Sequence, residues 1–335
     1  MLNEKILIIG GAGYVGSVVT SHFLKLGYKV NILDNFIYNN EFTITPYIGD
    51  ENYKIFKGDF GDNKILDECT KNVDQVFLLG GLVGDPITKN YPIESSNINE
   101  KQIFNCIDYF DNKKIEKLVF ISTCSNYGLI KENELADEEF ILNPLSLYAK
   151  AKVNAEKYLM SKKNKTNYSG VVLRFATAFG LSPRMRFDLT VSEFTRDLFL
   201  REELTVFDEH TWRPYCHVRD FARLLEIVFK ADRNKIHFET FNAGGDKNNF
   251  TKKMILDCIT DQIDDCKILF NQNDSDPRNY RVSFEKVKNQ LGFEPLLSVK
   301  DGVLELIKAL EMGLYSDSLL NRNQYGNFKI NYNLK

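Results

Sequence analysis

A glycine-rich stretch near the N-terminus, IGGAGYVG at residues 9–16, constrains the fold more than any other feature. It follows the apolar run KILII and precedes an amphipathic segment, which predicts a buried strand leading into a helix. Gly11, Gly13 and Gly16 match G-x-G-x-x-G, and Gly10 with the last two matches G-x-x-G-x-x-G. Such glycines allow a tight turn and close approach of a pyrophosphate to a helix N-terminus. The stretch predicts a dinucleotide site.

The first half of the chain alternates short apolar runs with helical patterns. Strands are predicted at 5–10, 29–34, 74–80, 117–123 and 169–177, and helices at 14–26, 97–111 and 146–162. The runs are nearly continuous in Val, Ile, Leu and Phe, as in parallel strands that are covered on both faces. This order predicts the α/β class, with a doubly wound parallel sheet of the Rossmann type.

The pattern loosens after residue 180. Helices are predicted at 188–200, 250–263, 283–291 and 299–312 and from about residue 219, and strands at 204–207 and 238–245. We expect a Rossmann domain at 1–180 with a return segment at about 217–245. A smaller α/β substrate-binding domain would then comprise 181–216 and 246–335. The last twenty residues are polar and unpatterned, and the sequence assigns them no role.

Composition narrows the classes of partner. The net charge is −3 over 335 residues and no basic tract occurs, which argues against nucleic acid and membrane surfaces as partners. No apolar run approaches the roughly 18 residues of a spanning helix. The six cysteines form no C-x-x-C pair, so we expect reduced thiols in a cytoplasmic protein and no metal site.

Asp34 ends the second predicted strand, 18 residues after Gly16. A carboxylate at that place can accept hydrogen bonds from the adenosine ribose and would repel a 2′-phosphate. NAD is therefore favoured over NADP.

The stretch YAKAK places Tyr148 one helical turn before Lys152. The i, i+4 spacing puts both side chains on one face of a helix. A lysine cation about 6 Å away, at an effective dielectric of about 20, favours phenolate by about 2.8 kcal/mol. The tyrosine pKa would then fall from about 10 to about 8. On its own the pair also fits a solvated lysine beside a half-buried tyrosine.

Three motifs in this order, the glycine loop, ISTCSNYG at 121–128 and YAKAK, resemble the extended short-chain dehydrogenase/reductase family of nucleotide-sugar epimerases and dehydratases. The resemblance covers about residues 5–312. It implies Tyr148 as acid/base, Lys152 as its partner and Thr123 as the hydroxyl that shares the proton. It also implies NAD, bound by Gly10, Gly11, Gly13, Tyr14, Val15, Gly16, Asp34, Asn35, Asp59, Phe60, Leu79, Gly80, Gly81, Asn97, Tyr148 and Lys152.

The same resemblance implies a nucleotide-diphosphate sugar as substrate, linked to GDP, UDP or dTDP. Arg213 and Arg278 would bind the diphosphate, since a guanidinium can bind such oxygens through two donors. The full predicted substrate set is Val83, Cys124, Ser125, Thr177, Arg184, Arg186, Arg213 and Arg278. The family also implies a homodimer, formed through the helices at 97–111 and 148–162.

The reaction stays open between alternatives. Cys124 and Ser125 stand where dehydratases of the family carry Asp-Glu, which disfavours dehydration. The remaining subgroup resembles nucleotide-sugar 4-epimerases and a GDP-heptose 4-dehydrogenase of surface-polysaccharide synthesis. A 4-ketoreductase of a deoxysugar pathway would use the same residues in reverse, and a non-catalytic NAD-sensing regulator is a third possibility. We expect the acidic run at 131–139 to be a solvated loop and His217 to be structural.

Overall fold

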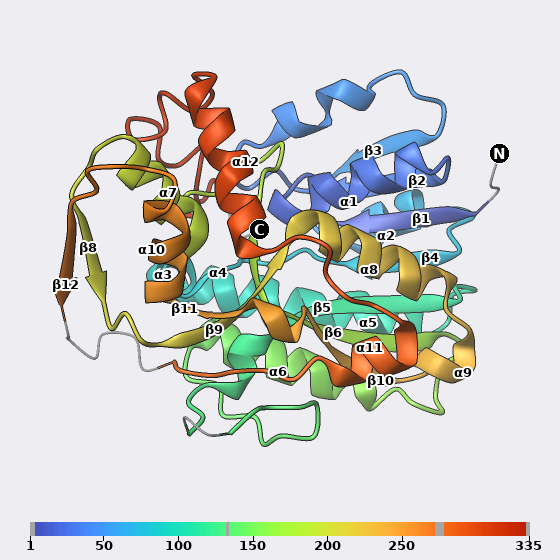
Figure 1. Cartoon of the computed structure of the whole chain (residues 1–335). Coiled ribbons are helices and arrows are strands. Elements are labelled where there is room, and N and C mark those ends of the chain that lie inside the picture. The colour runs from blue at the N-terminus through green and yellow to red at the C-terminus, as the bar shows by residue number, and fades with distance from the viewer. Residues whose placement is uncertain (1–3, 132–133, 272–277, 333–335) are drawn as a thin grey trace.

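The computed structural model describes residues 4–131, 134–271 and 278–332. Its centre is a parallel seven-stranded sheet in the order β10-β6-β5-β4-β1-β2-β3 (Figure 1). The strands are β1 (Lys5–Ile9), β2 (Lys29–Asp34), β3 (Tyr53–Lys57), β4 (Gln75–Leu78), β5 (Lys117–Thr123), β6 (Ser169–Phe175) and β10 (Glu239–Ala243). The predicted α/β class and doubly wound Rossmann sheet are confirmed.

Helices cover both faces of the sheet because alternate residues of each strand point to opposite sides. Ile6 and Ile8 of β1 pack with α1 (Tyr14–Lys25) and α8 (Val218–Lys230), which lie side by side (Figure 1). Leu7 and Ile9 pack on the other face with α2 (Asn63–Cys69), α5 (Ile103–Phe110) and α6 (Leu147–Met160). Two apolar cores result, which explains the near-continuous apolar runs of these strands.

Two smaller sheets lie beyond the central one. One holds β11 (Asn249–Thr251), β9 (Trp212–His217) and β7 (Thr177–Phe179), and the other pairs β12 (Ile268–Asn271) with β8 (Leu204–Phe207). The remaining helices are α3 (Asp85–Asn90), α4 (Pro92–Ser96), α7 (Thr190–Phe199), α9 (Arg233–Ile236), α10 (Lys252–Thr260), α11 (Glu285–Leu291) and α12 (Val299–Glu311). Short 3-10 helices are η1 (Glu41–Tyr47), η3 (Cys124–Tyr127) and η4 (Asp246–Asn248). None of the helices in the described residues could span a bilayer.

Some elements differ from the sequence prediction. The edge strand β3 was not predicted, because most of its residues are only half-buried or exposed and its apolar pattern is weak. The predicted helix at 97–111 begins with a π-helical stretch, η2 (Asn97–Gln102), before α5. The predicted strand at 169–177 divides into β6 and β7, which belong to different sheets.

The polar C-terminal segment, for which the sequence predicted no role, is tied to the rest of the fold. After α12, Tyr315 and Tyr325 pack edge-on against each other and both contact Phe187. The Phe187 N–H donates to the Tyr325 carbonyl at 2.7 Å. Farther along, the Asn331 N–H donates to the Ile37 carbonyl at 2.9 Å. The segment therefore runs from the region before α7 to the loop that follows β2.

Candidate active site

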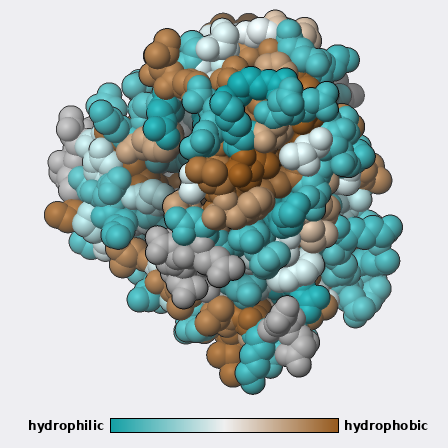
Figure 2. Space-filling view, turned by 60° about the vertical axis from the view of Figure 1, so that its left-hand side comes forward, coloured by the Kyte–Doolittle hydropathy of each residue, from teal (hydrophilic) through white to brown (hydrophobic). Residues whose placement is uncertain are grey.

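A pocket lies at the carboxyl ends of the central strands. The chain adds β2 and β3 on one side of β1, then β4, β5 and β6 on the other, so the strand order reverses between β1 and β4. Ligands of open α/β sheets bind at such a switch point. The pocket has a volume of about 420 Å³. Figure 2 brings the left side of Figure 1 forward and shows apolar residues gathered in the middle of this face within a hydrophilic surround.

The glycine loop has the shape of a cradle for a phosphate. Gly10 has a φ of +83°, and a Cβ on Gly16 would lie 2.0 Å from the Gly10 carbonyl oxygen. These two glycines are therefore required by the turn itself. A Cβ on Gly13 would meet only the Gly10 carbonyl oxygen, at 3.4 Å, so packing does not demand glycine there. Gly13 precedes α1 and lines the pocket, where a bare backbone leaves room for a ligand at the helix N-terminus.

Asp34 lies in the pocket at the end of β2. Its Oδ2 accepts from the Ala12 N–H at 3.0 Å and its Oδ1 accepts from the Phe36 N–H at 2.9 Å. Burial raises the pKa of this carboxyl, and the two N–H donors oppose the rise. Each oxygen accepts one of these bonds and can accept more, which fits a pair of ribose hydroxyls.

Tyr148 and Lys152 face the pocket from the first turns of α6, whose N-terminus is capped by Ser146. The Lys152 Nζ lies 5.8 Å from the centre of the Tyr148 ring and donates to the Ile121 carbonyl at 2.8 Å. Thr123 at the end of β5 also lines the pocket, with its Oγ1 2.7 Å from the Ser125 Oγ. The structure thus brings the three predicted catalytic side chains to one wall.

The predicted fall of the Tyr148 pKa is wrong for this chain on its own. Burial raises the pKa of Tyr148, Asp85 raises it further, and Arg186 opposes the rise. Burial also lowers the pKa of Lys152 to about 7, against a smaller opposite effect of Glu156. Desolvation disfavours the charged form of both groups, and the spacing of two residues along a helix carries no information about this cost. An unassisted Tyr148 therefore stays a neutral phenol.

Five pocket-lining side chains each carry a buried polar atom that has no hydrogen-bond partner among the described residues. The atoms are the Tyr38 hydroxyl, Asn40 Oδ1, Asp85 Oδ1, Arg184 Nε and Asn327 Oδ1. Burying an unpaired polar atom costs free energy, so such atoms are uncommon in native proteins. Their concentration around one pocket, together with the cradle, fits a bound dinucleotide.

The predicted substrate residues mostly reach the pocket. Val83, Ser125, Thr177, Arg184, Arg186, Arg213 and Arg278 line it. The guanidinium of Arg184 stacks over the Tyr38 ring at 4.4 Å, and Arg186 forms a two-point ion pair with Asp188. The carboxylate of Asp85 pairs with Arg278. The pocket wall therefore carries four guanidinium groups, two of them paired with carboxylates, and guanidinium groups suit phosphates.

Cys124 is a correction to the predicted set. Its side chain is 1% exposed and packs in the core, with Sγ donating to the Arg174 carbonyl at 3.1 Å. The residue does not line the pocket, because Thr123 and Ser125 on either side take the inward positions. The thiol is a small buried core group.

Three predicted cofactor residues also lie outside the pocket lining: Gly11, Asp59 and Asn97. Gly11 packs against Ile32, where a Cβ would meet Cγ2 at 2.5 Å. Asp59 Oδ1 accepts from Asn35 Nδ2 at 2.8 Å, and Asn97 Nδ2 donates to the Tyr332 hydroxyl at 3.4 Å. Gly10, Gly13, Tyr14, Val15, Gly16, Asp34, Asn35, Phe60, Leu79, Gly80, Gly81, Tyr148 and Lys152 do line it.

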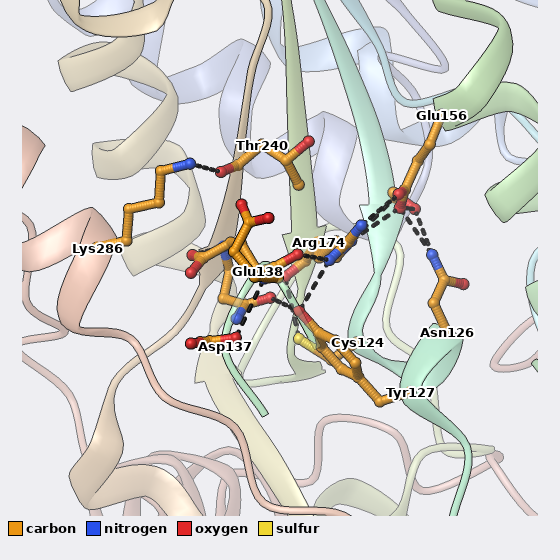
Figure 3. Close-up of polar contacts among 12 residues, drawn as sticks. Cys124, Asn126, Tyr127, Asp137, Glu138, Glu156, Arg174, Thr240 and Lys286 are labelled. Atoms are coloured by element: carbon orange, nitrogen blue, oxygen red, sulfur yellow. Dashed lines mark hydrogen bonds and ion pairs between the residues drawn. The ribbon is translucent and has the colours of Figure 1, made fainter. Parts of the chain in front are cut away.

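A buried polar network that the sequence did not predict lies behind the catalytic wall (Figure 3). Arg174 on β6 donates to both carboxylate oxygens of Glu156, which is one turn past Lys152 on α6. The same carboxylate accepts from Asn126 Nδ2 at 2.7 Å and from the Ser122 hydroxyl. The only sign of this network in the sequence was a charged residue in each of two elements, Arg174 in β6 and Glu156 in α6.

The network also reaches the acidic run at 131–139, of which residues 132 and 133 lie outside the described part. Arg174 Nη1 donates to the Glu138 carbonyl at 3.1 Å and to the Tyr127 hydroxyl at 2.9 Å. The Glu138 carboxylate accepts from the Asn242 N–H at 2.7 Å, and burial raises its pKa. Glu138 is therefore tied into the fold, whereas Lys131, Asp137 and Glu139 are exposed, so the prediction of a solvated loop is wrong for Glu138. His217 is buried and its Nε2 pairs with Glu305 at 2.6 Å.

Across the described residues, no group of three or more His, Cys, Asp or Glu side chains is arranged to hold a metal ion.

Comparison with known proteins identifies the family. Residues 6–244 match the family described as "NAD dependent epimerase/dehydratase family". The chain is an enzyme of that family. Its cofactor is NAD, as predicted, and the resemblance to the extended short-chain dehydrogenase/reductase family is confirmed at this level.

Relatives within the family span several named activities. The chain is 24% identical over 320 residues to a dTDP-glucose 4,6-dehydratase of Streptomyces niveus, covering 91% of this chain and 92% of that protein. It is 26% identical over 325 residues to YtcB of Bacillus subtilis, described as an uncharacterized UDP-glucose epimerase, covering 91% and 98%. The fold matches that of the UDP-glucuronic acid 4-epimerase of Bacillus cereus, solved in complex with UDP-glucuronic acid and NAD. The TM-score is 0.79 and the sequence identity is 23%, and the match covers 91% of this chain and 99% of that one.

Proposed function

We propose that the protein is a nucleotide-sugar 4-epimerase that works by transient oxidation of the sugar at C4, with net 4-dehydrogenation as the alternative outcome. One observation carries the proposal. The wall that bears Tyr148, Lys152 and Thr123 adjoins the glycine cradle and the four arginines within a single pocket. When bound, NAD supplies the hydride acceptor for the sugar carbon. The same pocket then has places for the dinucleotide, the sugar and a second diphosphate.

Tyr148 takes the sugar hydroxyl proton in this scheme. Its buried position raises its pKa, so the phenol is protonated until positive charge nearby favours the phenolate. Lys152, 5.8 Å from the ring and held by the Ile121 carbonyl, can provide part of that charge when it is protonated. Thr123 would bind the same sugar hydroxyl and pass the proton to Tyr148.

The substrate nucleotide would lie along Arg213 and Arg278. Arg213 stacks over the Tyr280 ring at 5.0 Å and Arg278 pairs with Asp85, so both guanidinium groups are held at the pocket wall. A diphosphate bound there would keep the sugar ring near Tyr148. Relatives named for UDP- and dTDP-linked sugars support a nucleotide-diphosphate sugar, and we propose UDP or dTDP as the first nucleotides to test.

Dehydration is disfavoured because no Asp-Glu pair follows Thr123, where dehydratases of this family carry one. The positions hold a buried thiol and a serine that contacts Thr123. Neither group offers a second acid to remove water from the sugar.

The division of the chain near residue 180 and the homodimer stay proposals. The outer faces of the two helices expected to pair are largely polar, with Asn154 donating to Glu100 at 2.8 Å and Tyr158 donating to Asp108 at 2.6 Å. A dimer through α5 and α6 would therefore be built around these polar contacts and the stacked rings of Phe104 and Tyr158. Sedimentation equilibrium tests it, and a monomer at micromolar concentration would contradict it.

A panel of UDP-, dTDP- and GDP-linked hexoses and uronic acids tests the function. Each is incubated with the purified protein and NAD, and products are read by NMR while absorbance at 340 nm is followed. A 4-epimerase gives the C4 epimer with no lasting absorbance, whereas a 4-dehydrogenase gives a ketone and stoichiometric absorbance. Failure to convert any sugar while NAD binds would contradict the proposal.

A further inference from the structure

The C-terminal residues 326–332, which we name the clasp, lie against the dinucleotide pocket. Asn327 and Phe328 line it directly. The sequence assigned no role to this segment, and the mechanism proposed above uses none of its residues.

The clasp begins at a fixed point. The ring cluster of Phe187, Tyr315 and Tyr325 anchors the chain just before it, and the Tyr325 hydroxyl donates to Asp317 at 2.9 Å. The clasp then contacts the loop before α7 in two places. Arg184 Nη2 donates to the Gly326 carbonyl at 3.2 Å, and the Asn327 N–H donates to Asp188 Oδ2 at 3.1 Å.

The clasp ends on the other side of the pocket. Asn327 Nδ2 donates to the Val83 carbonyl at 2.8 Å, next to the loop after β4. The Asn331 N–H donates to the Ile37 carbonyl at 2.9 Å, beyond the end of β2. Gln102 Nε2 donates to the Tyr332 hydroxyl at 2.8 Å. Four pocket-lining residues, Ile37, Val83, Arg184 and Asp188, are thus joined by one short stretch of chain.

The groups that face one another here are incompletely paired. Asn327 is 6% exposed and Arg184 is 2% exposed, yet Asn327 Oδ1 and Arg184 Nε have no partner among the described residues. The Tyr38 hydroxyl under the Arg184 guanidinium is likewise unpaired. One acceptor and two donors therefore meet between the clasp and the loop that follows Asp34.

We propose that the clasp closes the dinucleotide pocket and retains NAD between turnovers, with Asn327 as a binding residue for the dinucleotide. The proposal rests on the proposed function, because a cofactor that is reduced and reoxidised within one turnover has no need to leave. The contacts of the clasp are mostly single hydrogen bonds, so the segment can open locally without unfolding the domain.

The test measures how fast bound NAD exchanges with isotopically labelled NAD, followed by mass spectrometry of the intact complex. Three variants are compared with the wild type: a chain that ends after Tyr325, which keeps the ring cluster; Asn327→Ala; and Lys329→Ala as the control. Lys329 is an exposed residue of the same segment and does not line the pocket.

The shortened chain should exchange NAD at least about tenfold faster than the wild type, since several hydrogen bonds are lost. Asn327→Ala should speed exchange about three- to tenfold, the effect of one such bond. Lys329→Ala should stay within about twofold, as a surface change. In hydrogen–deuterium exchange, NAD should protect the amides of residues 326–332 in the wild type.

Wild-type exchange rates in the shortened chain, with an unchanged melting temperature, would overturn the proposal. If the shortened chain does not fold, an unchanged rate for Asn327→Ala together with no NAD-dependent protection of the clasp would overturn it equally. The proposed function fails separately: a wild type that retains NAD through the clasp but converts no nucleotide sugar removes the function and leaves the clasp intact.

Discussion

Two polar clusters, the network around Arg174 and Glu156 and the lining of the pocket, differ in how completely their atoms are paired. In the network, all three nitrogens of the Arg174 guanidinium group donate and both oxygens of Glu156 accept (Figure 3). Among its buried side-chain polar atoms, only Asn126 Oδ1 has no partner within the described residues. In the pocket, Tyr38, Asn40, Asp85, Arg184 and Asn327 each keep an unpaired atom.

This difference in hydrogen-bond pairing distinguishes a structural network, around Arg174 and Glu156, from a binding site, the pocket. A buried charge is tolerated where its partners are complete, and such a network holds its elements in one arrangement. A buried polar atom without a partner costs free energy in the ligand-free protein. A ligand that forms the missing hydrogen bond recovers that free energy. Changes in the network should therefore affect stability, and changes in the pocket should affect binding and turnover.

The largest effect is expected for Tyr148→Phe. Loss of the acid/base hydroxyl should lower kcat by roughly 10²- to 10⁴-fold, the usual worth of such a group. The melting temperature and the affinity for NAD should stay near the wild-type values, because the ring and its packing remain. Steady-state kinetics on the substrate found in the panel checks this. Residual activity above one tenth of wild type would remove Tyr148 from the mechanism.

Glu156→Gln should show the opposite pattern. It leaves Arg174 as a buried charge without its counter-charge, at a cost of about 3–5 kcal/mol in the free energy of unfolding. The matched control is Asp257→Asn, which breaks the exposed pair with Lys253 and should cost less than about 1 kcal/mol. Urea unfolding measures both. Equal, small losses would mean that the network around Arg174 and Glu156 is no scaffold.

Asp34→Ala should change cofactor choice more than stability. Removing a charged acceptor for the ribose hydroxyls should weaken NAD binding about 10- to 100-fold. It should also reduce the preference of the protein for NAD over NADP. Asp50→Ala, in an exposed loop, provides the control. Calorimetric titration with both cofactors gives the ratio. A preference for NAD that survives the change would place the ribose contact elsewhere.

The last prediction concerns the pH dependence of stability. The pKa of Lys152 is about 7 in the folded chain and 10.5 ordinarily, so between these values the unfolded chain binds a proton that the folded chain lacks. The free energy of unfolding therefore rises with pH between 7 and 10.5, and this contribution is lost progressively as pH falls from 10.5 to 7. Lys152→Met should flatten the rise. Urea unfolding of the NAD-free protein at pH 6, 8 and 9.5 checks it, and parallel curves would contradict it.

The residues that the sequence predicted from local motifs come together in one pocket. The glycine loop, Asp34, Thr123 and the Tyr148–Lys152 pair each lie within a few residues of a strand end or share one helix turn, so spacing alone places them. The clasp was missed because its contacts join distant positions, such as Asn327 and Val83, with no periodic pattern to reveal them. The predicted direction of the Tyr148 pKa shift was wrong because residue spacing indicates the neighbouring lysine but not how deeply the tyrosine is buried.

The most direct test of the contrast between the two clusters is a crystal structure of the complex with NAD. We expect the dinucleotide along the glycine loop and Asp34, with Tyr38, Arg184 Nε and Asn327 Oδ1 newly hydrogen-bonded and the Arg174–Glu156 network unchanged. A dinucleotide that leaves those three atoms unpaired, or that rearranges the network, would contradict the account.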